Sequence, residues 1–249
     1  ARELERAGVE IERVEGVPCV YRVLSYPRPL VKLRAYYSGY FHIQDVASVI
    51  AVLAADPRPG DRVADVCAAP GTKTSTLAHF MRNDGLIVSL DKSPTRMGVW
   101  KSEMRRLGVV VAHPVVGDAV NPPFKLKADV VVVDPPCSST GVFAKDPGAK
   151  WRLRPGDFWR YRRVQELILE GASRLVRRGG RLVYSTCSIA PEENELVVEN
   201  FLRRHPDFEA VDPETPFGSP SLRSSVPAVR LYPHKHGSSG YFIAVLRRR

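Results

Sequence analysis

Short runs of hydrophobic residues alternate along the chain with segments in which hydrophobic residues recur at helical spacing. The β-rich runs lie at residues 62–66, 86–91, 109–116, 129–134 and 180–186. Helical patterns lie between most of them, at residues 73–81, 93–108 and 158–178. Gly179 and Gly180 are expected to end the last helix. This alternation predicts an α/β fold with a doubly wound, mostly parallel sheet.

The two ends of the chain depart from this alternation. Residues 1–37 combine a short charged helix with two β-leaning runs, and we interpret them as a small N-terminal α/β extension of the main domain, residues 38–249. A helix is predicted at 44–57, and it should end where Pro57 restricts the residue before it. The last two β-runs, 228–234 and 240–248, have no helix between them, so they predict an antiparallel hairpin at one side of the sheet.

Composition adds a basic charge to this picture. The 249 residues include 37 Lys and Arg against 27 Asp and Glu, a formal net charge of +10. Such an excess favours a polyanionic partner such as a nucleic acid, although a basic surface also serves solubility. We expect neither a membrane span nor a signal peptide. The four cysteines are widely spaced and form no CxxC pair, so we expect free thiols in a reducing cytoplasm and no metal site.

The ends of the predicted strands carry the candidate ligand site, since ligands of open α/β sheets bind beyond the carboxyl ends of the strands. The segment DVCAAPGTKT, residues 65–74, offers small residues and a helix N-terminus, but it is neither GxGxxG nor GxxxxGK[ST]. Asp91 ends the second strand, where a ribose diol is commonly held, and Asp118 repeats the pattern after the third. Each aspartate alone is more commonly a helix cap. Together they favour a nucleoside ligand.

Two cysteines follow the fourth and fifth strands. The run DVVVV is followed by Asp134, two prolines and Cys137, and the prolines force a rigid exit from the strand. Cys187 lies one residue beyond the fifth strand. A lone cysteine, such as Cys19, is usually a packing residue. Two cysteines at the ends of adjacent strands, one of them after Asp-Pro-Pro, instead indicate thiol chemistry.

The motifs DVCAAPGTKT, DPPCSSTG and YSTCS, in this order, resemble those of the RNA cytosine-C5 methyltransferase family, the Nop2/Sun or RsmB-like group. The segments SGYFHIQDVAS and RLYPHKHGSSGYFIA are also similar to the family's. In the second of them, Ser239 stands where the family usually has Asp. The resemblance implies a Rossmann-like class I methyltransferase fold, S-adenosylmethionine as cofactor and RNA as partner, with tRNA ahead of rRNA.

The same resemblance implies roles for individual residues. Asp91 would bind the ribose of the cofactor and Asp118 the adenine edge, with Asp134 near the cofactor as well. Cys187 would be the nucleophile and Cys137 would serve product release, while Asp134 and Lys73 would face the target cytosine. The methionine part of the cofactor would be wrapped by Cys67, Ala68, Ala69, Pro70, Gly71, Thr72 and Lys73.

The chemistry of cytosine explains the use of two thiols. Its C5 atom is a poor nucleophile, and attack of a thiolate on C6 turns the ring into an enamine that can accept a methyl group. A free cysteine titrates near 8.5, so we expect a positive neighbour or the cofactor's own sulfonium to favour the thiolate. A carboxylic acid at Asp134 would protonate or hydrogen-bond N3 as charge builds on the ring, and Cys137 would assist the departure of the thiol. The base must also leave its stack to reach the pocket.

A basic run at residues 151–163, WRLRPGDFWRYRR, mixes arginine with aromatic residues. Arginine contacts to phosphate and stacking on bases suit RNA. The alternative is a solvated helix face with Trp159 anchored in the core. The candidate RNA contacts are Arg160, Arg162 and Arg163.

Three other functions compete with this hypothesis. Amino-group methyltransferases of nucleic acids also use an Asp-Pro-Pro turn, but they normally place an aromatic residue where this chain has Cys137. A non-catalytic RNA-binding scaffold would have no need of Cys187, Cys137, Asp134 and Lys73. A nicotinamide dehydrogenase would need the missing glycine fingerprint.

Overall fold

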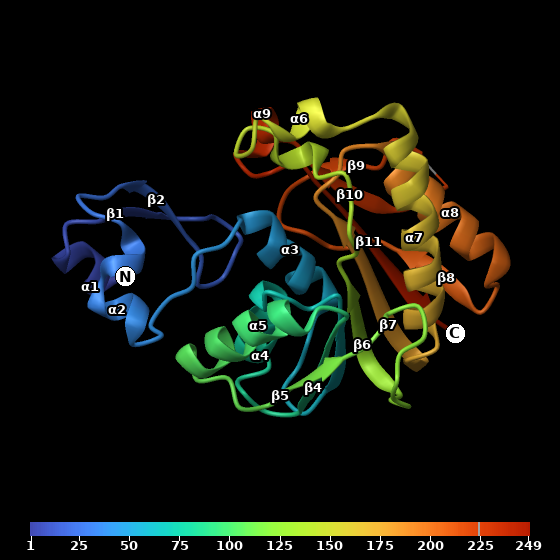
Figure 1. The fold of residues 1–249 in the computed structure, drawn as a ribbon, viewed down its shortest axis with the longest axis horizontal. Helices are drawn as coiled ribbons and strands as arrows, with labels where there is room; N and C mark the ends of the chain where they lie inside the picture. Colours follow the sequence, from blue (N-terminus) through green and yellow to red (C-terminus); the bar gives the residue numbers. More distant parts are fainter. Residues whose placement is uncertain (224) are drawn as a thin grey trace.

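The computed structural model describes residues 1–223 and 225–249, and its centre is one large sheet (Figure 1). Five parallel strands lie in the order β5-β4-β3-β6-β7, and antiparallel strands extend the sheet beyond β7 in the order β11-β10-β9, with β8 paired to β11. The parallel strands are β3 (Arg62–Val66), β4 (Leu86–Asp91), β5 (Ala112–Val116), β6 (Ala128–Val133) and β7 (Val176–Thr186). The antiparallel strands are β8 (Phe208–Val211), β9 (Ser219–Pro220), β10 (Ala228–Leu231) and β11 (Tyr241–Arg248). The predicted mostly parallel α/β fold and its terminal antiparallel hairpin are confirmed.

Helices cover both faces of this sheet (Figure 1). One face packs against α3 (Val46–Ala55) and α4 (Thr72–Phe80), with α5 (Pro94–Arg106) beside β4 and β5. The other face packs against α7 (Pro155–Ser173) and α8 (Glu195–Arg204). The four valines of strand β6 are explained by its burial on both faces. Val131 and Val133 pack toward α7 and α8, whereas Val130 and Val132 pack toward α3 and α4.

The N-terminal elements lie apart from the main sheet (Figure 1). Strands β1 (Glu10–Arg13) and β2 (Tyr21–Ser25) form a separate two-stranded antiparallel sheet. The other N-terminal elements are α1 (Arg2–Arg6), η1 (Leu30–Lys32) and α2 (Arg34–Tyr37). A domain boundary at residue 37 stays a prediction. The short elements of the main domain are η2 (Thr140–Val142), α6 (Ala149–Arg152), η3 (Pro191–Glu193) and α9 (Pro233–His236).

The predicted glycine stop after the long helix is wrong. Helix α7 ends at Ser173, and Gly179 and Gly180 lie inside β7. The Leu175 carbonyl accepts a hydrogen bond from the Ala128 backbone at 2.7 Å, so pairing with β6 draws the chain into the sheet before the glycines are reached.

Within the described residues, no helix is long and apolar enough to span a membrane.

Candidate active site

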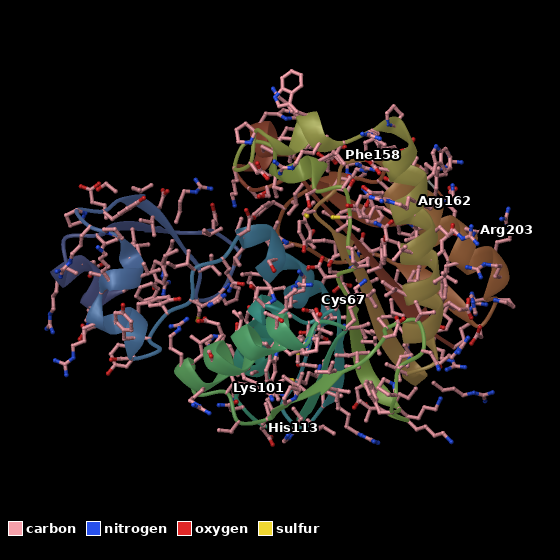
Figure 2. All side chains as sticks on the ribbon, viewed as in Figure 1. Cys67, Lys101, His113, Phe158, Arg162 and Arg203 are labelled. Atoms are coloured by element: carbon pink, nitrogen blue, oxygen red, sulfur yellow. The ribbon has the colours of Figure 1, made fainter. Side chains whose placement is uncertain are left out.

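A cavity of about 280 Å³ lies at the carboxyl ends of β3, β6 and β7. Most of the residues expected at the site from the sequence line it, namely Cys67, Ala68, Ala69, Pro70, Thr72, Lys73, Asp134 and Cys187. It is also lined by residues that the sequence did not single out, among them Gln44, Asp45, Asp65, Lys145 and Tyr241. The parallel strands therefore bring the separate motifs together at one edge of the sheet, with Cys67 near the middle of the molecule in Figure 2.

The loop after β3 is held close to its neighbours by backbone geometry. Cys67 and Gly71 both have positive φ, at 67° and 113°. A Cβ atom on Gly71 would lie 2.8 Å from the Met104 Cε atom and 3.0 Å from the Trp100 ring, so glycine is required at this position. Burial raises the pKa of the Cys67 thiol, and the neighbouring carboxylates raise it further. Cys67 is therefore a neutral wall of the cavity.

The two aspartates expected at the nucleoside part of a cofactor differ in their surroundings. Asp91 is 3% exposed, and its carboxylate accepts hydrogen bonds from the backbone of Ala69 at 3.2 Å and of Ser93 at 2.9 Å. It thus fixes the loop after β3. Asp118 is exposed and accepts a hydrogen bond from the Val120 backbone at 2.9 Å. Their cofactor contacts stay predictions.

Lys73, Asp134 and Tyr241 form one polar group at the cavity. The Lys73 ammonium group donates to one carboxylate oxygen of Asp134, and the Tyr241 hydroxyl donates to the other at 3.2 Å. Burial acts to lower the pKa of Lys73, but Asp134 and Tyr241 outweigh it and hold that pKa above its usual range. Both oxygens of Asp134 therefore accept hydrogen bonds, and the raised pKa of Lys73 keeps its ammonium group charged.

The two cysteine thiols meet at the edge of the cavity, which Cys187 lines and Cys137 does not. The Sγ atoms of Cys137 and Cys187 are 3.2 Å apart. The hydrogen bond to Cys187 and burial both hold the pKa of Cys137 above its usual range. The hydrogen bond from Cys137 lowers the pKa of Cys187, against the effect of burial, with help from Ser139 and Lys73. Cys187 is the thiol of the pair that ionises first, and Cys137 is the one that keeps its proton.

A buried carboxylate joins the two cysteine turns, and the sequence did not predict it. Glu193 is completely buried and accepts hydrogen bonds from the Ser138 backbone at 2.8 Å, from the Ser138 hydroxyl and from the Gln165 amide at 3.2 Å. The Ser138 hydroxyl lies 3.1 Å from that of Ser188. Because Ser138 follows Cys137 and Ser188 follows Cys187, this Glu193 network fixes one turn against the other.

Ser239, which departs from the resemblance, is held by a carboxylate from a distant helix end. Its hydroxyl donates to Asp45 at 2.6 Å, and Lys145 forms an ion pair with the same carboxylate. Asp45 caps the N-terminus of α3 by accepting from the Ala47 backbone at 2.9 Å. Three segments far apart in the chain therefore meet at this rim of the cavity.

The predicted RNA-contact arginines lie on α7, and Figure 2 shows Arg162 on the side of the molecule away from the N-terminal elements. Arg160 and Arg163 are exposed, and Arg160 pairs with Asp157 at 3.1 Å. The side chain of Arg162 is only 22% exposed and pairs with Glu166 at 2.9 Å. Trp159 is 58% exposed, so it is not the core anchor of the alternative interpretation.

The residues around the cavity fit a ligand that carries an ammonium group. Asp65 is 1% exposed, and its Oδ1 atom is buried without a hydrogen-bond partner among the described residues. The Thr74 hydroxyl donates to its other oxygen at 2.5 Å. Burial raises the pKa of Asp65 to about 6, so at neutral pH it is mostly ionised. The cavity thus offers a free acceptor for an amino group such as that of a methionine moiety.

The doubly wound sheet, with its ligand loop after β3 and a cavity at the carboxyl ends, defines a class I methyltransferase architecture. A profile of the family described as "16S rRNA methyltransferase RsmB/F" matches residues 52–247. The chain belongs to this family.

Individual relatives agree with this assignment. The chain is 32% identical to "Probable ribosomal RNA small subunit methyltransferase B" of Bacillus subtilis, over 99% of this chain and 56% of the relative. It is 36% identical to "tRNA (cytosine(72)-C(5))-methyltransferase" of Pyrococcus horikoshii, over 88% of this chain and 55% of the relative. The crystal structure of NSun6 from Pyrococcus horikoshii with SFG, an analogue of S-adenosylmethionine, matches with a TM-score of 0.81, 33% identity, and coverage of 92% of this chain and 59% of that one. The chain spans about half the length of these relatives.

Proposed function

We propose that this chain catalyses the transfer of a methyl group from S-adenosylmethionine to C5 of a cytosine in RNA, through a covalent bond between Cys187 and C6. The observation that carries the proposal is the pair of thiols, whose Sγ atoms are 3.2 Å apart, with Cys187 lining the cavity. Direct attack by an amino group would need neither thiol, so the pair favours C5 over amino-group methylation and over a non-catalytic scaffold.

S-adenosylmethionine, when bound, supplies the methyl group as an electrophile. The loop at residues 67–73 would hold its methionine part, and the unpartnered Asp65 oxygen would accept from its amino group. Asp91 would bind the ribose, and it would also hold the loop by accepting a hydrogen bond from the Ala69 backbone. Asp118 would approach the adenine edge, as the family resemblance implies.

The first step needs Cys187 as a thiolate. The lowered pKa of Cys187 arises from its hydrogen bond to Cys137, against the effect of burial, with help from Lys73. The sulfur forms a bond to C6 of the cytosine, and the ring electrons move toward C5, which becomes nucleophilic. The Lys73–Asp134 pair lies in the same cavity, where Lys73 can donate a hydrogen bond to the ring as negative charge develops on it.

Release requires loss of the proton on C5 and cleavage of the bond between sulfur and C6. The raised pKa of Cys137 comes first from its hydrogen bond to Cys187. Once Cys187 is bonded to carbon, it no longer carries the charge that Cys137 stabilised, so Cys137 becomes easier to ionise and gives its proton to bulk water. The Cys137 thiolate then takes the C5 proton, the double bond between C5 and C6 reforms, and Cys187 leaves as a thiolate.

The substrate within this proposal is RNA, with tRNA ahead of rRNA. The relatives carry names for both kinds of RNA, and the tRNA enzyme is 36% identical to this chain. The test is bisulfite sequencing of total RNA after incubation with the protein and S-adenosylmethionine. A new protected cytosine that is absent with Cys187→Ser supports the proposal. Methylation found only on amino groups would overturn it.

A further inference from the structure

A serine hydroxyl lies beside the two thiols, although neither the motifs nor the proposed reaction assign it a role. The Ser139 Oγ atom is 3.5 Å from the Sγ atom of Cys187 and 3.9 Å from that of Cys137. Hydrogen bonds to sulfur are longer than those between oxygen and nitrogen, so the Ser139 hydroxyl is within reach of a thiol or thiolate. A hydroxyl can accept from a thiol and can turn to donate to a thiolate.

The backbone of Ser139 is in a conformation that favours glycine. Its φ is 58° and its ψ is 27°, in the left-handed region. Holding a residue other than glycine there costs free energy, and such outliers gather at functional sites. A glycine at this position would adopt the same backbone without strain. The chain therefore has a serine at a position whose backbone conformation favours glycine.

The surrounding contacts explain why the chain must turn at this point. Ser138 is tied to Glu193 on one side of Ser139. On the other side, the Gly141 backbone donates to the Cys187 carbonyl at 2.8 Å, and a Cβ atom on Gly141 would lie 2.0 Å from the Gly240 carbonyl oxygen. The left-handed turn joins these two fixed points and directs the Ser139 hydroxyl at the thiols.

We propose that Ser139 is a catalytic residue whose hydroxyl donates a hydrogen bond to the Cys187 thiolate and so increases the fraction of Cys187 that is ready to attack at neutral pH. This role rests on the proposed function of the thiol pair. The proton that Cys187 loses passes to bulk water. Ser139 keeps its own proton, and none of its covalent bonds changes.

Other groups also act on the ionisation of Cys187, namely Cys137, Asp134, Lys73 and Tyr241. The hydrogen bond from Cys137 lowers the pKa of Cys187 most, while burial and the charge of Asp134 raise it. Ser139 and Lys73 lower it further. Removing the Ser139 hydroxyl changes no charge and removes no thiol, and unlike removal of the Tyr241 hydroxyl it leaves the hydrogen bonds to Asp134 in place.

The effect of Ser139 has a signature that a purely structural residue lacks. A hydrogen bond that stabilises a thiolate raises its population but lowers its intrinsic nucleophilicity. Removing the hydroxyl should therefore slow Cys187 at neutral pH and leave its rate unchanged or slightly higher at alkaline pH, where the thiol is ionised anyway. A disturbed fold would instead change the reaction rate of Cys187 at every pH, either by slowing the reaction or by exposing the thiol.

The experiment is the pH dependence of alkylation of Cys187 by iodoacetamide, followed by mass spectrometry of each cysteine peptide. It compares the intact chain with Ser139→Gly, which relieves the backbone, and Ser139→Ala, which keeps the strain. At about pH 7 both variants should react at Cys187 about 3- to 10-fold more slowly, the scale of one hydrogen bond. At high pH they should react as fast as the intact chain or slightly faster. Cys19 is exposed and is therefore not the packing residue expected from the sequence; it is the internal control, and its rate should not change.

An unchanged pH profile in folded Ser139→Gly would overturn the proposal, and so would equal slowing at every pH. The assay contains neither RNA nor S-adenosylmethionine. Its outcome therefore stays distinct from that of the methylation test, which alone decides the proposed function.

Discussion

Replacing Glu193 by glutamine should loosen the two cysteine turns while leaving the fold intact. The buried carboxylate accepts three hydrogen bonds, two from Ser138 and one from Gln165. All three partners are donors, so a carboxylate matches them completely. Glutamine offers one acceptor oxygen, and its amide group must face the Ser138 hydroxyl, which has to turn round and accept.

The expected cost follows from these contacts. A hydrogen bond to a charged group contributes about 1.5–3 kcal/mol and a neutral one about 0.5–1.5 kcal/mol. Because the Ser138 hydroxyl can reorient, Glu193→Gln should lower the free energy of unfolding by about 1–3 kcal/mol. Glu193→Ala, which leaves several buried donors without a partner, should lower it by about 3–5 kcal/mol.

The assay is equilibrium unfolding in urea, combined with single-turnover methylation. Glu192→Gln, one residue away and partly exposed, is the matched control and should behave like the intact chain. Glu193→Gln should also slow turnover with little change in KM, because it shifts Cys137 relative to Cys187 rather than the RNA-binding surface. Unchanged stability and turnover in Glu193→Gln would refute the argument that this network positions the thiols.

Three further predictions concern the cofactor, the RNA and the fold. Asp91→Ala should weaken S-adenosylmethionine binding by about 1.5–3 kcal/mol in calorimetry, and unchanged affinity in a folded variant would remove Asp91 from the cofactor site. RNA affinity should fall steeply with salt, and the log–log slope should flatten by about two after joint neutralisation of the three α7 arginines. These arginines are Arg160, Arg162 and Arg163. Arg162 is held in a partly buried pair with Glu166, whereas Arg160 is exposed and its pair with Asp157 can open to bind a phosphate. An unchanged slope would show that this face of α7 is only solvated and does not contact RNA. Glu195→Gln should destabilise the fold by about 3–5 kcal/mol, because it leaves Arg230 buried without its partner. Burial opposes ionisation of Glu195, but Arg230 holds the pKa of Glu195 below the usual 4.5. The pair therefore stabilises the fold above about pH 4.5, and this stabilisation is lost as the pH falls further. In urea unfolding below about pH 4.5, the free energy of unfolding should fall more steeply with pH in the intact chain than in Glu195→Gln.

The meeting of the motifs was predictable because parallel strands end at one edge of a sheet. The valines of β6 fit a strand buried on both faces, and the prolines after Asp134 fit an abrupt exit. Cys187 lies one residue beyond β7, as the sequence indicated. Strand periodicity and turn residues are local properties, and they were enough to bring Cys137 and Cys187 to the same edge.

The parts that could not be predicted depend on contacts between distant residues. In the sequence, Glu193 is one of several polar residues before a helix, and nothing local indicates that Ser138 will be its partner. The same holds for Tyr241 against Asp134, whose hydrogen bond spans 107 positions. The end of α7 was misplaced for a related reason. Leu175 continues a helical pattern, but backbone pairing with Ala128 overrides it.

The most direct test of the covalent mechanism compares Cys187→Ser and Cys137→Ser with RNA and S-adenosylmethionine on a denaturing gel. Cys187→Ser should give no methylation and no covalent complex, because an alcohol is a far poorer nucleophile for C6 at neutral pH. Cys137→Ser should attack and methylate but release slowly, so a protein–RNA adduct should accumulate. An adduct in the Cys187 variant instead would reverse the two roles. Intact methylation in both variants with no adduct in either would contradict the covalent mechanism.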